Sequence, residues 1–259
     1  DQVADFITLV ALFGVVLGGR LGYMLLYDFD HFIHEPWSLF LINQGGMASH
    51  GGIAGVALFC LWYARRHKIS WMGIGDTLVC GAPMGIFLGR IANFINGELF
   101  GRVTTVPWAM KFPGELHHED FVRQGGEYVP LPPGAVHSPD IIAFFEQTRG
   151  GREELAHILH ARHPSQLYEA FGEGLFLCAL LLFLRVKYPR LPHGVLSGLF
   201  FILYALVRIA LEGVRQPDSG AHGIMGMTHG QFYSVFMILI GVLFMVSSRF
   251  TKTKKAAGK

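Results

Sequence analysis

Six long apolar runs dominate the pattern of hydrophobic and polar residues along the chain. A helix needs about 20 mainly apolar residues to cross the hydrocarbon of a bilayer, and each run approaches that length. The runs cover residues near 3–29, 46–63, 74–94, 166–184, 194–213 and 231–248. The second run is short and glycine-rich at its start, so it could enter the membrane as a partly re-entrant element. The pattern predicts an all-α fold, a polytopic transmembrane helical bundle.

One sizeable polar stretch interrupts this pattern between the third and fourth runs. It covers residues 101–163 and includes charged residues, histidines and a proline-rich segment at 130–134. We expect it to form a small head outside the membrane, whose internal structure the pattern does not predict. The expected organisation is three spans over residues 1–100, the head over 101–163, three spans over 164–250 and a basic tail over 251–259.

The composition agrees with a membrane protein. Hydrophobic residues make up 51% of the 259 residues and charged residues only 15%, whereas about 25% of the residues in an ordinary soluble domain are charged. A formal net charge of +2 is too small to indicate a nucleic-acid partner. Cys60, Cys80 and Cys178 each lie within an apolar run, which predicts buried small side chains rather than a disulfide framework or a metal cluster.

Lysine and arginine in the short loops predict the orientation of the bundle. Basic clusters follow the second, fourth and sixth runs: Arg65, Arg66 and Lys68; Arg185, Lys187 and Arg190; Arg249, Lys252, Lys254 and Lys255. Alternating spans put all three clusters on one side, which the positive-inside rule assigns to the cytoplasm. We therefore expect the head and the loop after Arg215 on the outer side. Because the chain begins at Asp1 rather than Met, we also expect an upstream segment that could add another span.

Ionisable residues within the apolar runs indicate a functional site. Such residues are costly in the membrane and usually face a cavity or a partner. The helical periodicity groups them into polar faces: Tyr204, Arg208, Glu212 and Arg215; Arg90, Asn93 and Gly97, with Gly101 if that helix continues; Arg20, Tyr23 and Tyr27. Several inward-facing guanidinium groups favour an anionic ligand, and phosphate matches their geometry. Taken singly, an arginine could instead form a structural ion pair, such as Arg208 with Glu212.

His50 is a candidate for proton transfer. It lies in the segment Ser49-His50-Gly51-Gly52, where a loop enters the second apolar run. A single histidine is more often structural than catalytic, but flanking glycines allow a substrate or backbone to come close. A histidine can take a proton from a thiol near neutral pH.

Four sequence blocks resemble those of the prolipoprotein diacylglyceryl transferase family, in the order found in that family. They are HGG at 50–52, GRIANFINGELFGR at 89–102, HPSQLYE at 163–169, and RIALE at 208–212 followed by RQPD at 215–218. The resemblance extends over nearly the whole chain outside the head. The first span of that family carries a functionally important tyrosine and has no counterpart here, so that position stays unassigned.

The resemblance implies transfer of the diacylglyceryl group of phosphatidylglycerol to the thiol of a lipobox cysteine in the signal peptide of a preprolipoprotein. It implies His50 as the base and Arg90 and Arg208 as the groups that stabilise the departing phosphate. The residues expected to orient these groups or to bind substrate are Asn93, Asn96, Glu98, Gly101, Tyr204 and Glu212. Glu98 could instead pair with Arg102, and Asn96 could be a helix cap.

The expected surroundings follow from the same resemblance. The enzyme would lie in the bacterial inner membrane as a multi-pass protein, among membrane lipids. We expect no metal and no other cofactor, because the reaction needs none and the sequence has no glycine-rich phosphate loop or cluster of metal ligands.

Two other classes of function also place polar residues in a membrane. A transporter or channel for an anionic solute would need inward arginines, and usually internal repeats, of which the sequence shows none. An intramembrane serine protease would need a paired serine and histidine. Ser49 adjoins His50 and Ser165 follows His163, but neighbouring residues point apart on regular elements and no Gly-x-Ser-x-Gly elbow occurs.

Overall fold

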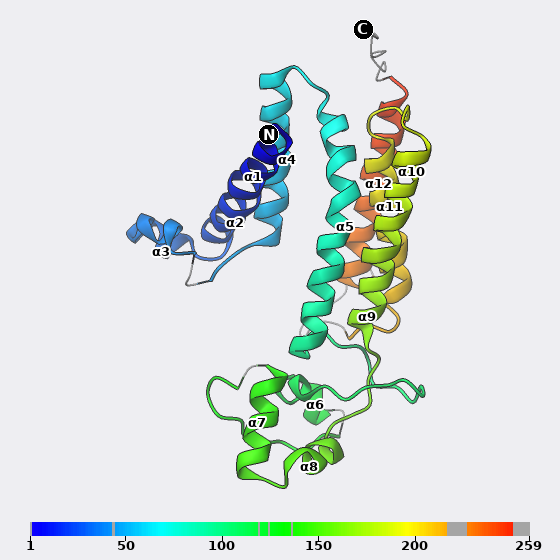
Figure 1. The fold of residues 1–259 in the computed structure, drawn as a ribbon. Helices are drawn as coiled ribbons and strands as arrows, with labels where there is room; N and C mark the ends of the chain where they lie inside the picture. Colours follow the sequence, from blue (N-terminus) through cyan, green and yellow to red (C-terminus); the bar gives the residue numbers. More distant parts are fainter. Residues whose placement is uncertain are drawn as a thin grey trace. The chain divides into compact units, whose positions relative to one another are not determined.

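The computed structural model describes residues 2–42, 45–118, 120–123, 125–135, 137–216 and 227–250. The chain divides into two compact units, Asp1–Gly75 and Asp76–Lys259. Helices make up most of the described residues, and extended pairing within them is limited to isolated bridges (Figure 1). The prediction of an all-α fold is confirmed. The basic tail at 251–259 and most of the loop after Arg215 lie outside the described residues.

The first unit contains two long helical runs. The first run consists of α1 (Gln2–Leu9), a π-helix η1 (Val10–Leu17) and α2 (Gly18–Leu26), and the second is α4 (Ser49–His67). Between them lie a short helix α3 (Phe29–His34) and a 3-10 turn η2 (Pro36–Phe40), which the apolar pattern did not predict. The second apolar run is therefore a continuous helix that starts at Ser49 rather than near residue 46.

Glycines let the two long runs of the first unit approach closely. A Cβ atom on Gly22 would lie 2.5 Å from the Cα of Gly51, and one on Gly18 would lie 2.9 Å from the Cα of Gly55. Small residues at Gly18, Gly22, Gly51 and Gly55 thus allow close contact between the two backbones. It places the backbone next to His50 directly against α2.

The second unit contains the other four long helical segments. They are α5 (Trp71–Asn96), which begins just before the unit boundary; a run of α9 (Ser165–Glu169), π-helix η5 (Ala170–Phe176) and α10 (Leu177–Lys187); α11 (Val195–Leu211); and α12 (His229–Ser248). Helices α11 and α12 meet at Gly198 and Gly241, where an added Cβ on either would lie 2.7 Å from the carbonyl oxygen of the other. A Cβ added to Gly85 or Gly89 of α5 would meet no atom within 4 Å in the described part of this unit, so these two glycines mark no close helix contact there.

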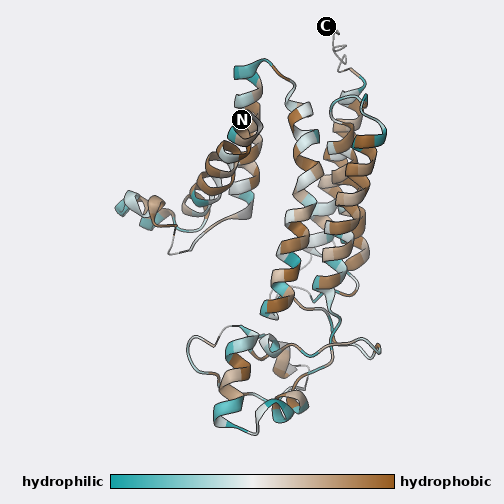
Figure 2. Ribbon diagram, viewed as in Figure 1, coloured by the Kyte–Doolittle hydropathy of each residue, from teal (hydrophilic) through white to brown (hydrophobic). Residues whose placement is uncertain are grey.

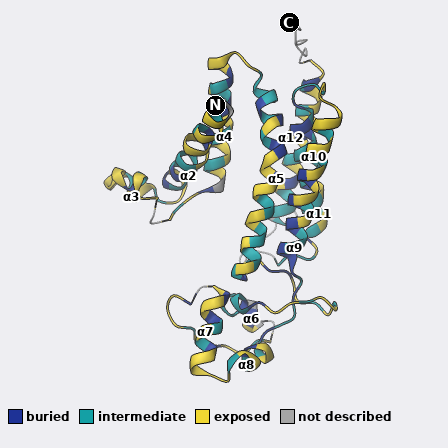
Figure 3. Cartoon of the chain, viewed as in Figure 1, coloured by how far each residue is buried: buried dark blue, intermediate teal, exposed yellow. Residues whose placement is uncertain are grey.

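The apolar surface faces outward, as expected in a membrane. Leu26, Phe183 and Leu243 are each more than half exposed on helices whose outer faces are hydrophobic (Figures 2 and 3). Four helical stretches are long and apolar enough to cross a bilayer: Ala4–Leu26, Trp71–Asn96, Ser165–Lys187 and Gly230–Ser248. Helix α11, with 17 residues, is shorter, and α4 carries Arg65 and Arg66 in its last turn. The chain is a multi-pass membrane protein.

Buried side chains hold three of the four helical segments of the second unit together. Val79 and Cys80 of α5 pack with Leu181 of α10 and Leu196 of α11. Cys60, Cys80 and Cys178 are all buried, as the sequence predicted.

A buried carboxylate joins two of these helices near their ends. Asp76 on α5 is only 1% exposed. Its side chain accepts hydrogen bonds from the backbone N–H groups of Gly194 and Ser197, each at 2.8 Å, and from the Ser197 hydroxyl at 2.7 Å. These donors lie at the start of α11, where N–H groups have no partner within the helix. Asp76 therefore caps α11 from a neighbouring helix.

We expect Asp76→Asn to lower thermal stability, because an amide has one fewer acceptor atom and loses the charge-assisted hydrogen bonds. The cost should be about 1–3 kcal/mol, or about 2–4 °C in Tm for each kcal/mol in a chain of this size. Asp30→Asn on the exposed side of α3 is a matched control and should leave Tm unchanged. Equal melting temperatures for the Asp76 variant and the unmodified protein would contradict this role.

The segment at 101–163 has a small core of its own. It contains η4 (Pro113–His117), α6 (Asp120–Arg123), α7 (Ser138–Thr148) and α8 (Gly151–Ile158). Ile141, Phe145 and Leu155 are at most 3% exposed within this core. Arg162 is fully buried, pairs with Glu115 and lies 4.9 Å from the centre of the Phe100 ring, which ties the segment to the residues just after α5. Within the second unit, this segment lies at the opposite end of the bundle from the C-terminal ends of α10 and α12 (Figure 1).

Candidate functional site

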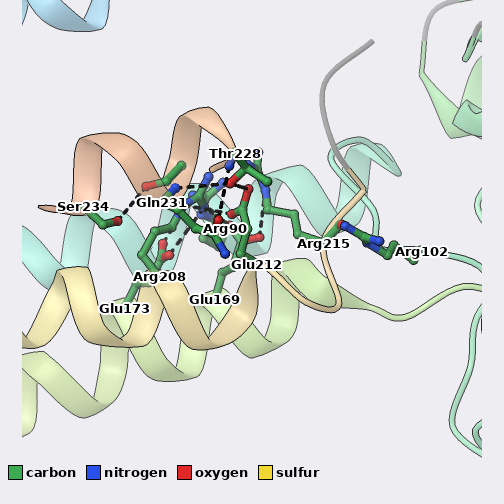
Figure 4. Close-up of polar contacts among 11 residues, drawn as sticks. Arg90, Arg102, Glu169, Glu173, Arg208, Glu212, Arg215, Thr228, Gln231 and Ser234 are labelled. Carbon is green, nitrogen blue, oxygen red and sulfur yellow. Dashed lines mark hydrogen bonds and ion pairs between the residues drawn. The ribbon is translucent and has the colours of Figure 1, made fainter. Parts of the chain in front are cut away.

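Three arginines and three glutamates form one ionic network in the second unit. The residues come from segments far apart in the sequence, namely Arg90 on α5, Glu169 on α9, Glu173 on η5, Arg208 on α11, and Glu212 and Arg215 just after α11 (Figure 4). The network lies at the end of the bundle where α5 and α11 finish and α9 begins.

Two carboxylates lie between Arg90 and Arg208. Arg90 Nη2 is 2.7 Å from Glu169 Oε2 and 3.3 Å from Glu173 Oε2. Arg208 Nη1 is 3.5 Å from Glu169 Oε2 and 3.5 Å from Glu173 Oε1. Both arginines therefore share the same pair of counter-charges, which fixes the two guanidinium groups next to each other.

The other two charged residues extend the network toward α12. Arg215 Nε lies 3.3 Å from Glu169 Oε1, so Glu169 contacts all three arginines. Glu212 is 3.9 Å from Arg208 Nε and accepts a hydrogen bond of 2.6 Å from the Thr228 hydroxyl. Thr228 is the N-cap of α12, where it exchanges hydrogen bonds with Gln231.

The arginines, rather than the glutamates, are the accessible side of this network. The side chains of Arg90, Arg208 and Arg215 are 17%, 14% and 13% exposed. Those of Glu169 and Glu173 are at most 1% exposed. An anion that approaches the network therefore meets guanidinium groups first, and the buried carboxylates hold those groups from behind.

The last turn of α5 provides a second polar group. The Asn96 amide nitrogen donates to Glu98 Oε1 at 3.2 Å. The Asn93 amide is best turned so that its nitrogen donates to the same Glu98 oxygen and to the Gly89 carbonyl, each at 3.2 Å. The alternative ion pair of Glu98 with Arg102 is not adopted, because Arg102 Nε donates to the Arg215 carbonyl at 2.9 Å. The structure thus brings together Asn93, Asn96 and Glu98.

The sequence predicts Gly101 on the face of Arg90 and Asn93 only if the helix continues, and the helix ends before it. Helix α5 ends at Asn96, and Gly97 follows with φ of +72°, a left-handed conformation that glycine adopts without strain. Gly101 instead forms an isolated bridge with Arg215, and its N–H donates to the carbonyl of His163 at 2.9 Å. An added Cβ there would lie 2.6 Å from the Val214 carbonyl oxygen. Gly101 therefore allows three chain segments to cross beside the network.

Tyr204 and Glu212 lie as the helical spacing predicted. Tyr204 is one turn before Arg208 on α11. Glu212 is the C-cap of α11, and Arg215 lies beyond the helix yet still reaches Glu169.

His50 and Arg20 belong to the first unit. His50 lies in the first turn of α4 and is exposed. Arg20 is buried and donates to backbone carbonyls, including those of Gly46 at 3.1 Å and Leu41 at 3.3 Å. The expectation that Arg20 contributes to an anion site is therefore wrong, because its guanidinium group holds the loop that leads to α4.

Sequence reasoning missed two central residues, Glu169 and Glu173. Both are acidic residues in an otherwise apolar run, four positions apart, and either property could have identified them. Glu169 also ends the HPSQLYE block. Within the part of the chain that the structure describes, no three potential metal ligands come together.

Comparison with known proteins supports the resemblance carried by the four sequence blocks. A family model described as prolipoprotein diacylglyceryl transferase matches residues 1–247. The chain belongs to this family. A phosphatidylglycerol–prolipoprotein diacylglyceryl transferase of Idiomarina loihiensis is 42% identical over 239 residues, which cover 91% of this chain and 73% of the relative. One from Xylella fastidiosa is 41% identical (92% and 75% covered), and one from Bdellovibrio bacteriovorus is 38% identical (95% and 79% covered).

The sequence blocks that resemble the prolipoprotein diacylglyceryl transferase family supply charged residues of the network. Three of the four sequence blocks lie in the second unit, and each contributes a charged residue to the network: Arg90, Glu169 and Arg208. Segments some 40 to 120 positions apart thus converge on one group of charges within a membrane bundle.

Proposed function

We propose that the protein transfers the diacylglyceryl group of phosphatidylglycerol to the thiol of the lipobox cysteine of a preprolipoprotein. The reaction forms a thioether and releases glycerol phosphate. Family membership supports this proposal, since the relatives carry the name of this enzyme. The observation that carries it is the network of three arginines, whose guanidinium groups form the accessible side of a site within a membrane bundle.

The reaction is a displacement at carbon. The thiolate attacks the third glycerol carbon of the diacylglyceryl group, a C–S bond forms, and the C–O bond breaks with its electrons going to the phosphate. The departing phosphate gains negative charge in a site with little water, where fixed positive groups act strongly. Arg90 and Arg208 are suited to this task because Glu169 and Glu173 hold both guanidinium groups in place.

The remaining polar residues have supporting tasks in this scheme. His50, at the start of α4, accepts the proton of the cysteine thiol. Asn93, Asn96 and Glu98 form a hydrogen-bonding group suited to the hydroxyls of the glycerol head group. Tyr204 and Glu212 orient the arginines from α11, and Gly101 lets the neighbouring segments pack beside them.

The alternatives have weaker support. An anion transporter would also use inward arginines, but family membership favours the transferase. For a serine protease, Ser165 would have to face His163, whereas its hydroxyl donates to the Leu99 carbonyl at 3.2 Å.

A direct assay tests the transferase reaction. Purified protein is incubated with phosphatidylglycerol and a lipobox peptide, and the peptide is analysed by mass spectrometry. We expect a diacylglyceryl thioether on the cysteine peptide and no modification of a matched peptide with serine in that position. Solute flux in liposomes without any thioether would support the transporter instead.

We further propose that the bundle lies in the bacterial inner membrane, with the basic loops in the cytoplasm and the 101–163 head in the periplasm. Cysteines introduced at Gly125 and Lys187 can be labelled from either side with a membrane-impermeant reagent. We expect label at Gly125 only from outside and at Lys187 only from the cytoplasm. The buried native cysteines should give little background. A label that reaches Gly125 only from the cytoplasm would refute the orientation.

A further inference from the structure

Glycines flank Glu173 on both sides, and each faces a different helix. A Cβ on Gly174 would lie 2.6 Å from the Cβ and 2.7 Å from the Cα of Phe87 on α5. A Cβ on Gly172 would lie 2.7 Å from a methyl carbon of Val207 on α11. A larger side chain at Gly174 would therefore have to displace the backbone of α5, and one at Gly172 would have to displace the Val207 side chain of α11. The segment Gly172-Glu173-Gly174 is the place where α5 and α11 both come close to η5.

The two helices that approach here are those that carry the arginines. Arg90 follows Phe87 by three residues and so lies on the same face of α5. Arg208 directly follows Val207 on α11. Glu173 is fully buried between them, 3.3 Å from Arg90 and 3.5 Å from Arg208.

The local backbone supports the same geometry. Glu173 lies in the π-helix η5, and π-helical turns inside α-helices are frequently found at functional sites. The wider turn changes the direction in which side chains leave the helix. Glu169, the last residue of α9, and Glu173, four residues later in η5, both reach Arg90 and Arg208.

We propose that Glu173 is a positioning residue that fixes the distance and orientation of the Arg90 and Arg208 guanidinium groups, and that Gly172 and Gly174 permit the helix contacts this requires. The proposal rests on the proposed transferase function. Two guanidinium groups repel each other, so an anion between them is needed to hold them close in a water-poor site. Glu173 is suited to this because it is buried behind the arginines and leaves their accessible side to the lipid phosphate.

This role predicts a specific kinetic signature for Glu173→Gln. The amide keeps the shape but lacks the charge, so the two guanidinium groups should move apart. We expect kcat per folded molecule to fall roughly 10–100-fold, by analogy with residues that orient metal ligands, whose loss has an effect of this size. KM for phosphatidylglycerol should stay constant or fall, because a competing negative charge next to the arginines has been removed.

The experiment measures kcat, KM and Tm in parallel for the wild type, Glu173→Gln and Asp76→Asn. Asp76 is also a buried carboxylate of the bundle, but it lies 14 residues before Arg90 on α5, or about 21 Å along the helix. Asp76→Asn should lower Tm and leave kcat per folded molecule unchanged. Two results for Glu173→Gln would overturn the proposal. One is a kcat per folded molecule within twofold of the wild type, and the other is a KM that rises in parallel with the loss of Tm.

A second pair of variants keeps the test decisive if Glu173→Gln does not fold. Gly174→Ala retains Glu173 but pushes α5 away, so kcat should fall at least tenfold. Gly81→Ala, on α5 with open space around it within this unit, should have wild-type kcat. Equal kcat for the two glycine variants would refute the proposal. If the wild type itself formed no thioether, the transferase function would fail, whereas active variants beside an active wild type would refute only the role of Glu173.

Discussion

Arg90→Ala is expected to lower turnover by about 10²–10³-fold, the usual cost of removing one preorganised group that stabilises developing negative charge. Arg90 makes the shortest ion pair of the network, 2.7 Å to Glu169, and its side chain is among the accessible ones. Arg90→Lys should recover only part of the rate, because lysine keeps the charge but loses the forked geometry. Turnover is measured as the rate of thioether formation.

Arg208→Ala should have a comparable effect, and a double variant shows whether Arg208 only balances Glu212. If it did, adding Glu212→Gln would restore both stability and turnover. The structure predicts otherwise. Arg208 lies closer to Glu169 and Glu173, at 3.5 Å each, than to Glu212 at 3.9 Å, and Glu212 has its own partner in Thr228. We therefore expect the double variant to remain inactive.

The control for these variants is an arginine outside the network. Arg152 lies in the 101–163 segment, its side chain is 75% exposed, and it pairs with Glu146. Arg152→Ala should retain wild-type turnover. A folded Arg90→Ala variant that is as active as Arg152→Ala would remove Arg90 from the mechanism.

His50→Asn is expected to lower turnover by roughly 10²–10⁴-fold, the contribution typical of a general base. Binding of phosphatidylglycerol should change little, because asparagine keeps a polar group of similar size. Raising the pH should restore part of the rate, since more of the peptide thiol, with an ordinary pKa of about 8.5, is then ionised without help. The measurement is the pH profile of thioether formation for the variant and the wild type.

A second histidine on the same helix provides the comparison for His50. His67 lies at the other end of α4, is exposed and stacks against Tyr63. His67→Asn should retain the wild-type rate at every pH. If His50→Asn does the same, His50 has no part in proton transfer and its glycine-rich surroundings serve helix packing alone.

Helix periodicity explains how much of the site could be predicted from the sequence. Tyr204, Arg208 and Glu212 recur at intervals of four on a regular α-helix, so their shared face followed directly from their spacing. The lengths of the apolar runs likewise predicted the helical segments, because the thickness of the hydrocarbon sets the length of a span.

The predictions that failed also have identifiable physical causes. Gly97 ends α5 in a left-handed conformation, so the periodicity that linked Arg90 with Gly101 stops before Gly101. Glu169 and Glu173 lie at the start of a long apolar run, where their role depends on arginines some 80 and 40 positions away. Spacing along the chain says nothing about such long-range partners. The 101–163 segment could not be derived because its core is formed by short helices without a repeated pattern.

Inhibition by the product glycerol phosphate tests most directly whether Arg90 and Arg208 bind the phosphate that departs in the reaction. The inhibition constant is measured with a fixed lipobox peptide and varied phosphatidylglycerol, for the wild type, Arg90→Lys, Arg208→Lys and Arg152→Lys. We expect inhibition competitive with the lipid in the wild type and in Arg152→Lys, and at least tenfold weaker inhibition in the Arg90 and Arg208 variants. The same inhibition constant in all four proteins would contradict phosphate binding by these two arginines.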